Sequence, residues 1–211
     1  RATVANVDDT DTRHFIDLLL NAKCFIVFGR RRSGFVRRGF TVRLTHLALP
    51  AYFVGETVSP PVHEDDVVIL LSGSGETFSV VVTGQVAKKL GSKIVSITGN
   101  PASSLAKMSD LTILLRTPSG ERQRSLAPLG TLFEAASATF LDGVVAELIR
   151  FFGANEVSML ARHATLDCTS RRGARGSSFV RKAGGWKPDV RRQMLRPPSA
   201  ARTTCPPDPP M

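Results

Sequence analysis

Five short apolar runs alternate with helical patterns along most of this chain, and this alternation limits the possible folds more than any other feature. The runs are residues 24–29, 51–55, 66–72, 93–98 and 111–116, and the helical patterns cover about 34–48, 77–90, 102–108 and 129–152. The runs are apolar at nearly every position, which is typical of strands buried on both faces. Because β-α-β crossovers place helices over both faces of a sheet, we expect a doubly wound parallel α/β domain.

The charge and the prolines divide the chain into two parts. The net charge is +10, but residues 167–211 carry ten Lys and Arg against three Asp, or +7, whereas residues 1–166 carry eighteen against fifteen acidic residues, or +3. The last segment also holds seven of the 13 prolines. We therefore expect one domain over 1–166, followed by a disordered basic tail over 167–211. A tail of this kind leaves open a function in binding RNA or acidic partners.

Cysteine usage and the length of the apolar runs indicate the compartment. The three cysteines form no disulfide framework, and no apolar run approaches the roughly 18 residues that a membrane helix needs. We expect a soluble, cytoplasmic protein without a membrane partner. The first residue is Arg1 and no signal-peptide pattern follows, so we expect the natural beginning to be missing. No histidine pair has the spacing of zinc ligands, which predicts no metal and no cofactor.

Hydroxyl and glycine residues follow the third apolar run, where Ser72-Gly73-Ser74-Gly75-Glu76-Thr77 leads into a helical pattern. Ligands of open parallel sheets bind beyond the carboxyl ends of the strands, at such loops. The glycines let the backbone bend, and the hydroxyls of Ser72, Ser74 and Thr77 join the N–H groups of the helix start. The loop is therefore a candidate phosphate cradle. The alternative is a plain helix cap followed by a turn.

A second loop of the same kind follows the first apolar run and strengthens the phosphate interpretation. It reads Gly29-Arg30-Arg31-Arg32-Ser33-Gly34 and also runs from a strand into a helix. Neither loop has the Gly-Lys-Ser/Thr ending of a P-loop or the three glycines of a dinucleotide fingerprint. Two hydroxyl-bearing loops in one sheet favour an anion site built without lysine or metal.

Five motifs in order along the chain resemble the 6-phospho-3-hexuloisomerase family of SIS (sugar isomerase) domain enzymes. They are "RSG" at 32–34, "VGET" at 54–57, "SGSGET" at 72–77, "PLGTLFE" at 128–134 and "RHATL" at 162–166. The resemblance implies a flavodoxin-like three-layer sandwich and a homo-oligomer, expected to be a tetramer with active sites shared between subunits. The implied reaction interconverts D-arabino-hex-3-ulose 6-phosphate and fructose 6-phosphate through an enediolate, in the ribulose monophosphate pathway.

The same resemblance assigns roles to individual residues. Glu134 is the candidate base, and the apolar residues around it predict partial burial, an environment suited to proton transfer. His163 is the second candidate catalytic group, supplied by a neighbouring subunit. Glu56 is a candidate contact for the sugar hydroxyls. The predicted phosphate ligands are the hydroxyls of Ser33, Ser72, Ser74 and Thr77, with the backbone N–H groups of Gly73 and Gly75.

One departure from the family pattern lies inside the first loop. Relatives read Gly-Ala-Gly-Arg-Ser-Gly, so Arg31 stands where they have the second glycine. If that position needs positive φ, arginine costs about 1–2 kcal/mol and obstructs the pocket. Otherwise the guanidinium adds charge for the phosphate. A non-catalytic SIS module that binds a phosphosugar as a regulator is the alternative to an enzyme, whereas the presence of both Glu134 and His163 favours the enzyme.

Overall fold

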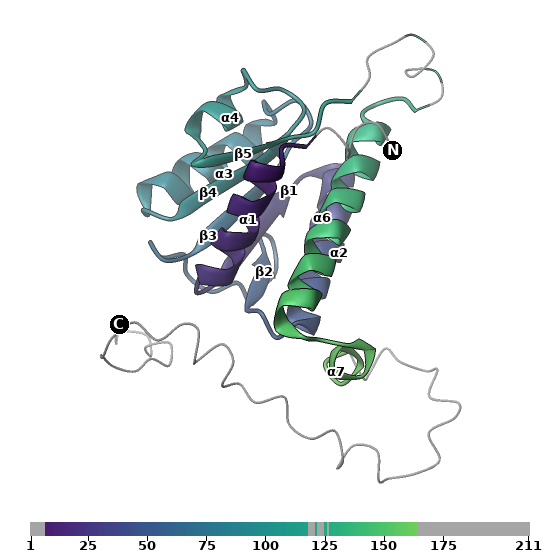
Figure 1. The fold of residues 1–211 in the computed structure, drawn as a ribbon. Helices are drawn as coiled ribbons and strands as arrows, with labels where there is room; N and C mark the ends of the chain where they lie inside the picture. The colour runs from purple at the N-terminus through teal and green to yellow at the C-terminus, as the bar shows by residue number, and fades with distance from the viewer. Residues whose placement is uncertain (1–6, 118–120, 122–124, 126, 164–211) are drawn as a thin grey trace, which may run out of the picture. The chain divides into compact units, whose positions relative to one another are not determined.

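The computed structural model describes residues 7–117, 121, 125 and 127–163, and the predicted tail lies outside them. Strands and helices alternate through most of this part of the chain, except that β3 follows β2 and α7 follows α6 directly (Figure 1). The strands are β1 (Phe25–Gly29), β2 (Ala51–Phe53), β3 (Val67–Leu71), β4 (Lys93–Thr98) and β5 (Leu111–Leu114). The helices are α1 (Asp9–Asn21), α2 (Arg31–His46), α3 (Phe78–Lys89), α4 (Ser104–Met108), α6 (Thr131–Phe152) and α7 (Glu156–Leu160).

All five strands are parallel and lie in the order β2-β1-β3-β4-β5, which confirms the predicted doubly wound sheet. The predicted apolar runs match the strands to within two residues at each end. The central strands β1 and β3 are buried along their whole length. Their continuous apolar sequence therefore reflects burial on both faces.

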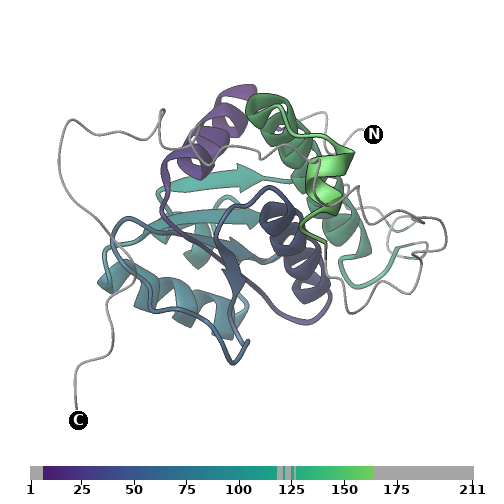
Figure 2. The same ribbon diagram turned by 90° about the horizontal axis from the view of Figure 1, so that it is seen from below.

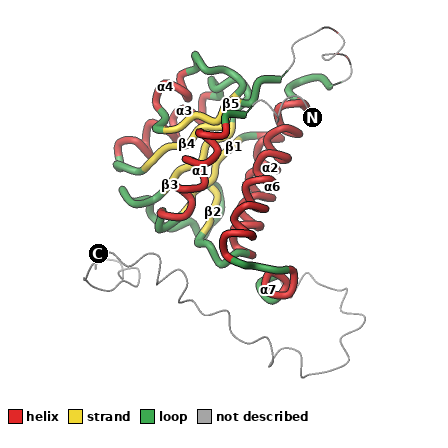
Figure 3. The backbone as a smooth tube through the Cα atoms, viewed as in Figure 1, coloured by secondary structure: helices red, strands yellow, loops and turns green. Residues whose placement is uncertain are grey.

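The strands send alternate side chains into two cores, and helices cover both faces of the sheet (Figures 1 and 2). Phe25, Val27 and Ile69 belong to the core shared with α1, α2 and α6. Ile26 and Leu70 belong to the core beneath α3 and α4. The tube view shows the same arrangement of helix, sheet and helix (Figure 3). This is the three-layer sandwich that the family resemblance implies.

The helix ends follow capping rules in most places. Side-chain oxygens of Asp8, Ser103 and Asn155 accept backbone N–H groups at the starts of α1, α4 and α7. Gly91 has φ +82° immediately after α3, as expected for the glycine predicted to end that helix. The short helix α7 was not predicted. Its capping box between Asn155 and Ser158 is the signal that marks it.

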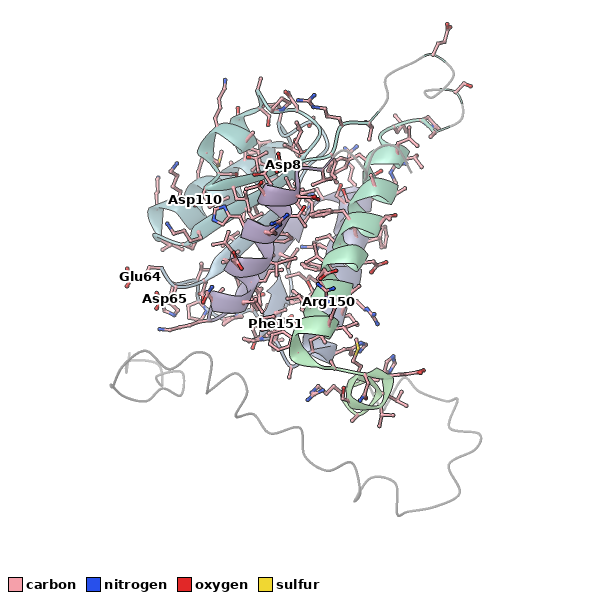
Figure 4. The ribbon with its side chains drawn as sticks, in the orientation of Figure 1. Asp8, Glu64, Asp65, Asp110, Arg150 and Phe151 are labelled. Carbon is pink, nitrogen blue, oxygen red and sulfur yellow. The ribbon has the colours of Figure 1, made fainter. Side chains whose placement is uncertain are left out.

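Acidic side chains gather at the amino-end edge of the sheet. Glu64 and Asp65 lie in the loop before β3, and Asp110 lies just before β5 (Figure 4). Asp110 accepts the backbone N–H of Ile94 at 2.8 Å, and Asp65 pairs with Lys23 at 2.6 Å. These carboxylates hold strand starts together, whereas the loops at the opposite, carboxyl-end edge carry hydroxyls and arginines. No helix among the described residues is long and apolar enough to cross a membrane.

Candidate active site

The two predicted loops leave neighbouring strands at the same edge of the sheet. β1 and β3 are paired in parallel with Gly29 opposite Leu71, so the loops that follow them start side by side. The chain runs outward from β1 to β2 and then returns past β1 to β3. This reversal is the switch point at which doubly wound sheets bind ligands. The sequence signals and the topology therefore indicate the same place.

The loop after β3 is held by hydrogen bonds among its own residues. The buried Ser72 hydroxyl lies 2.9 Å from the Thr77 hydroxyl and accepts the Gly75 N–H at 3.1 Å. The Ser74 hydroxyl accepts the Glu76 N–H at 3.2 Å. The Gly75 N–H, predicted as a phosphate donor, also points to the Ser72 carbonyl at 3.0 Å, so a phosphate contact there would have to replace these bonds.

Hydroxyl hydrogens remain available in this loop. Ser72 and Thr77 share one hydrogen between their oxygens, which leaves the second hydroxyl hydrogen of the pair for another acceptor. Ser74 is exposed, and its oxygen acts as the acceptor in its hydrogen bond with the Glu76 N–H. The loop can thus donate at least two O–H groups to an anion without losing its own structure.

Two glycines in the loop after β3 let neighbouring side chains pack closely against its backbone. A Cβ at Gly75, whose φ is +68°, would lie 2.1 Å from the Ser103 hydroxyl oxygen. A Cβ at Gly73 would lie 3.1 Å from the Phe133 ring. Gly73 therefore brings the loop after β3 against the first turn of α6, where Glu134 follows Phe133.

The loop after β1 begins α2 with a strained residue. Arg31 has φ +51°, so the position does require the left-handed conformation that glycine adopts without penalty. Ser33 is buried two residues later, and its hydroxyl donates to Glu134 Oε1 at 3.4 Å, a long and weak hydrogen bond. Ser33 and Glu134 are thus brought together across 101 positions of sequence.

Glu134 has one carboxylate oxygen that is buried and only partly satisfied. Its side chain is 20% exposed, and Oε2 lies 3.2 Å from Arg32 Nη2. That distance makes an ion pair, but Oε2 accepts no hydrogen bond from any described residue. A buried polar atom without a hydrogen bond is uncommon and is often functional. Oε2 is therefore held by the charge of Arg32 and by packing, without a hydrogen bond from any described residue.

Arg32 is the residue of this site to which the sequence analysis assigned no role. Its guanidinium donates to Thr131 Oγ1 at 2.9 Å and to the Leu129 carbonyl, in addition to pairing with Glu134. It belongs to the "RSG" motif, which was the signal available in the sequence. Its partners lie about a hundred positions away, so only the folded chain identifies them.

Three helix N-termini at this edge lack side-chain caps. No described side chain caps α2, α3 or α6, whereas α1, α4 and α7 all have such caps. Uncapped N–H groups carry the positive end of the helix dipole and bind anions. The uncapped helices α2 and α3 start in the two predicted loops, and α6 starts three residues before Glu134, which contacts Ser33.

His163 lies far from Glu134 of its own chain. Its ring lies against that of His46, with centroids 5.1 Å apart, at the end of α2 opposite Ser33. From Ser33 to His46 the helix rises about 20 Å at ~1.5 Å per residue. α2 and α6 lie side by side, and α7 follows the far end of α6 (Figure 1). His163 therefore cannot meet Glu134 within one subunit.

Glu56 is exposed in the turn after β2. Burial against the Phe28 and Phe53 rings lowers the pKa of Arg37, and the Glu56 carboxylate acts in the opposite direction. Glu56 thus lies near a stacked guanidinium, and its role as a sugar contact stays a prediction. Among the described residues, no group of three or more metal-ligating side chains could hold a metal ion.

Comparisons with known proteins agree with this geometry. The SIS domain model matches residues 18–140. An uncharacterized protein of Archaeoglobus fulgidus is 40% identical over 166 residues, which cover 77% of this chain and 91% of that protein. The 3-hexulose-6-phosphate isomerase of Methanocaldococcus jannaschii is 38% identical over 151 residues, covering 72% of this chain and 81% of the relative.

A solved structure extends the likeness to three dimensions. A crystal structure from Methanococcus jannaschii, described as inferring a function of 3-hexulose-6-phosphate isomerase, has a TM-score of 0.70 and 36% identity. It covers 74% of this chain and 86% of that chain. Sequence and fold therefore resemble the same group of proteins.

Proposed function

Because this chain belongs to the SIS domain family and is a homologue of the 3-hexulose-6-phosphate isomerases, we propose that it isomerises D-arabino-hex-3-ulose 6-phosphate and fructose 6-phosphate. The coarser assignment, a sugar-phosphate isomerase, is supported by the family and by the named relatives. The pathway follows from this substrate: the ribulose monophosphate route, in the cytoplasm. The buried, half-satisfied carboxylate of Glu134 beside three uncapped helix ends carries the proposal.

Glu134 performs both proton transfers in this proposal. In the direction of fructose 6-phosphate, the Glu134 carboxylate takes the proton from C2, beside the C3 carbonyl, and an enediolate forms across C2 and C3. The carboxylic acid then returns the proton to C3, while the hydroxyl proton of O2 moves to O3. The carbonyl ends at C2, and the carboxylate is regenerated. One carboxylate suffices because the proton is taken and returned at adjacent carbons.

The 6-phosphate is bound at the loops that lead into the uncapped ends of α2 and α3. The Ser72, Ser74 and Thr77 hydroxyls and the Gly73 N–H are its proposed donors, and the helix dipoles favour its charge. Ser33, on the neighbouring loop, contacts Glu134, since its hydroxyl reaches Oε1. The phosphate thereby holds the carbonyl region of the sugar near the base.

His163 is proposed to act in the site of a neighbouring subunit. It is too far from its own Glu134, whereas α7 presents it at the exposed end of the domain. A homo-oligomer, proposed to be a tetramer, would bring one chain's His163 to another chain's Glu134. There the imidazole assists ring opening and movement of the hydroxyl proton.

The test is turnover by the full chain. Purified protein is incubated with D-arabino-hex-3-ulose 6-phosphate, and fructose 6-phosphate is followed with a coupled dehydrogenase. We expect a kcat within the common range of about 1–10³ s⁻¹. Glu134→Gln should lower it by about 10²–10⁴-fold while the fold, measured by circular dichroism, stays intact.

A folded protein without turnover would contradict the proposal. If calorimetry showed that this protein still binds fructose 6-phosphate, the alternative hypothesis of a regulator with a non-catalytic SIS module would be favoured. Turnover of a different phosphosugar would support the assignment as a sugar-phosphate isomerase but contradict the proposed substrate.

A further inference from the structure

We propose that Arg32 is a positioning residue, which fastens the start of α6 to the start of α2 and holds the Glu134 carboxylate in place. The role in catalysis rests on the proposed function. The fastening itself does not, because it is a property of the contacts described below.

Arg32 donates hydrogen bonds to two groups of one short segment and forms an ion pair with a third. Nη1 donates to Thr131 Oγ1 at 2.9 Å, Nη2 donates to the Leu129 carbonyl, and Nη2 lies 3.2 Å from Glu134 Oε2. The Thr131 hydroxyl in turn donates to the Pro128 carbonyl at 2.7 Å. A planar guanidinium can serve several acceptors in fixed directions, whereas an ammonium is a point charge. The pattern of partners therefore requires arginine specifically.

The segment that Arg32 holds is strained and has no other side-chain cap among the described residues. Leu129 and Gly130 both adopt the left-handed conformation, with φ of +56° and +83°. Leu129 is also 91% exposed, so packing of its side chain does not hold this turn in place. A strained non-glycine residue persists only where its surroundings enforce it. Arg32 supplies this enforcement through its hydrogen bond to the Leu129 carbonyl.

Charge gives Arg32 its second effect. Among the described residues, Arg32 is the cation within ion-pair distance of Glu134. Arg37 on the same helix points elsewhere, to the Val54 and Gly34 carbonyls. Opposite charges attract at this distance, so the ion pair helps to hold the carboxylate where it lies. The pair acts through charge, because Oε2 accepts no hydrogen bond from any described residue.

The experiment compares Arg32→Gln, Arg32→Lys and the control Arg38→Gln in the full chain. Arg38 lies on the same helix, is exposed and stacks on Phe53, so its loss removes equal charge away from Glu134. The readouts are kcat and KM across pH, and hydrogen exchange of the amides of 127–137. The exchange measurement is independent of activity, so it tests the fastening even if the wild-type chain turns over no sugar phosphate.

In Arg32→Gln, we expect kcat to fall about 10²-fold through misplacement of the base. KM should change much less than kcat, because Arg32 holds the base rather than the phosphate. Arg32→Lys should still lower kcat about tenfold, since the ammonium cannot hold two acceptors and the carboxylate together. Exchange of 127–137 should be faster in both Arg32 variants and unchanged in Arg38→Gln.

Two results would overturn the inference. One is unchanged hydrogen exchange of residues 127–137 in Arg32→Gln, which would show that Arg32 does not stabilise the start of α6. The other is an active wild-type enzyme in which Arg32→Gln raises KM alone, with kcat unaltered. Arg32 would then be a substrate-binding residue. Absence of wild-type turnover, by contrast, contradicts the proposed function and leaves the exchange result to decide on the fastening.

Discussion

Gly75 shows how a single position shapes the loop after β3. It combines φ +68° with a site where any Cβ would come within 2.1 Å of the Ser103 hydroxyl oxygen and 2.4 Å of the Ser103 Cβ. Ser103 is fully buried and caps α4, so it cannot move aside without losing its own bonds. Conformation and close contact therefore both require glycine.

We predict that Gly75→Ala lowers the free energy of unfolding by about 2–5 kcal/mol, from left-handed strain and overpacking together. Urea denaturation measures this. Gly143→Ala is the matched control, because Gly143 lies in α6 and a Cβ at that position would meet nothing within 4 Å. That change should raise the free energy of unfolding by about 0.5–1 kcal/mol. Equal effects at the two positions would contradict the close-contact argument.

Arg31 is a strained residue, with φ +51°, at the position where the family resemblance implies glycine. Replacement by glycine removes about 1–2 kcal/mol of left-handed strain and adds about 0.5–1 kcal/mol of chain entropy cost. We therefore predict that Arg31→Gly raises the free energy of unfolding by about 0.5–1 kcal/mol, measured by denaturation. If Arg31 obstructs the pocket, KM for the sugar phosphate should fall as well. A rise in KM would instead show that its charge assists phosphate binding.

Among the helices, the end of α2 and the segment with α7 meet through two histidines. His46 and His163 lie ring to ring, and Arg162 Nη1 lies 3.5 Å from the His46 carbonyl. Burial lowers the pKa of His46, and the charges of His163 and Arg43 add to this. The groups facing His46 from both elements, His163, Arg43 and Arg162, are all cationic or become cationic.

The sign of the pH effect follows from the lowered pKa. His46 binds a proton less readily when residues 156–163 pack against the end of α2 than when they have come away from it. Its contribution to the stability of this packing is therefore complete above about pH 6.5 and is lost as pH falls through the lowered pKa. We predict faster hydrogen exchange of 156–163 at about pH 5 than at about pH 8, after correction for intrinsic rates. His46→Asn should reduce this difference. An unchanged difference in the variant would assign the effect to another group.

For the assembled protein as a whole, the separation of His163 from Glu134 makes a prediction about mixed oligomers. Glu134→Gln and His163→Ala should each be nearly inactive alone. When the two variants are co-expressed, random assembly gives sites with both native residues in about a quarter of cases, so activity should return to about a quarter of the wild-type value. Continued inactivity of the mixture, with both variants folded and assembled, would contradict a site shared between subunits.

The fold class and the location of the loops could be predicted from the order of residues alone. Continuous apolar runs such as Val67–Leu71 are typical of strands covered on both faces, and the glycines and serines after them indicate where the chain turns into helices. Local rules of this kind act over a few residues, which is why Gly91 and the ends of the strands were predictable. The short helix α7 was missed because five residues carry too little hydrophobic periodicity to be recognised.

Which side chains meet was settled by the packing of the folded chain. The strand order puts the loops after β1 and β3 side by side, and the packing of α6 on α2 brings Arg32 and Ser33 to Glu134. It also carries His163 to the opposite end of α2, against His46. These pairings join positions about a hundred residues apart, and they depend on how helices pack across the sheet rather than on any local pattern. The sequence determines which chemical groups are present, whereas the packing of the folded chain determines which of them lie close together.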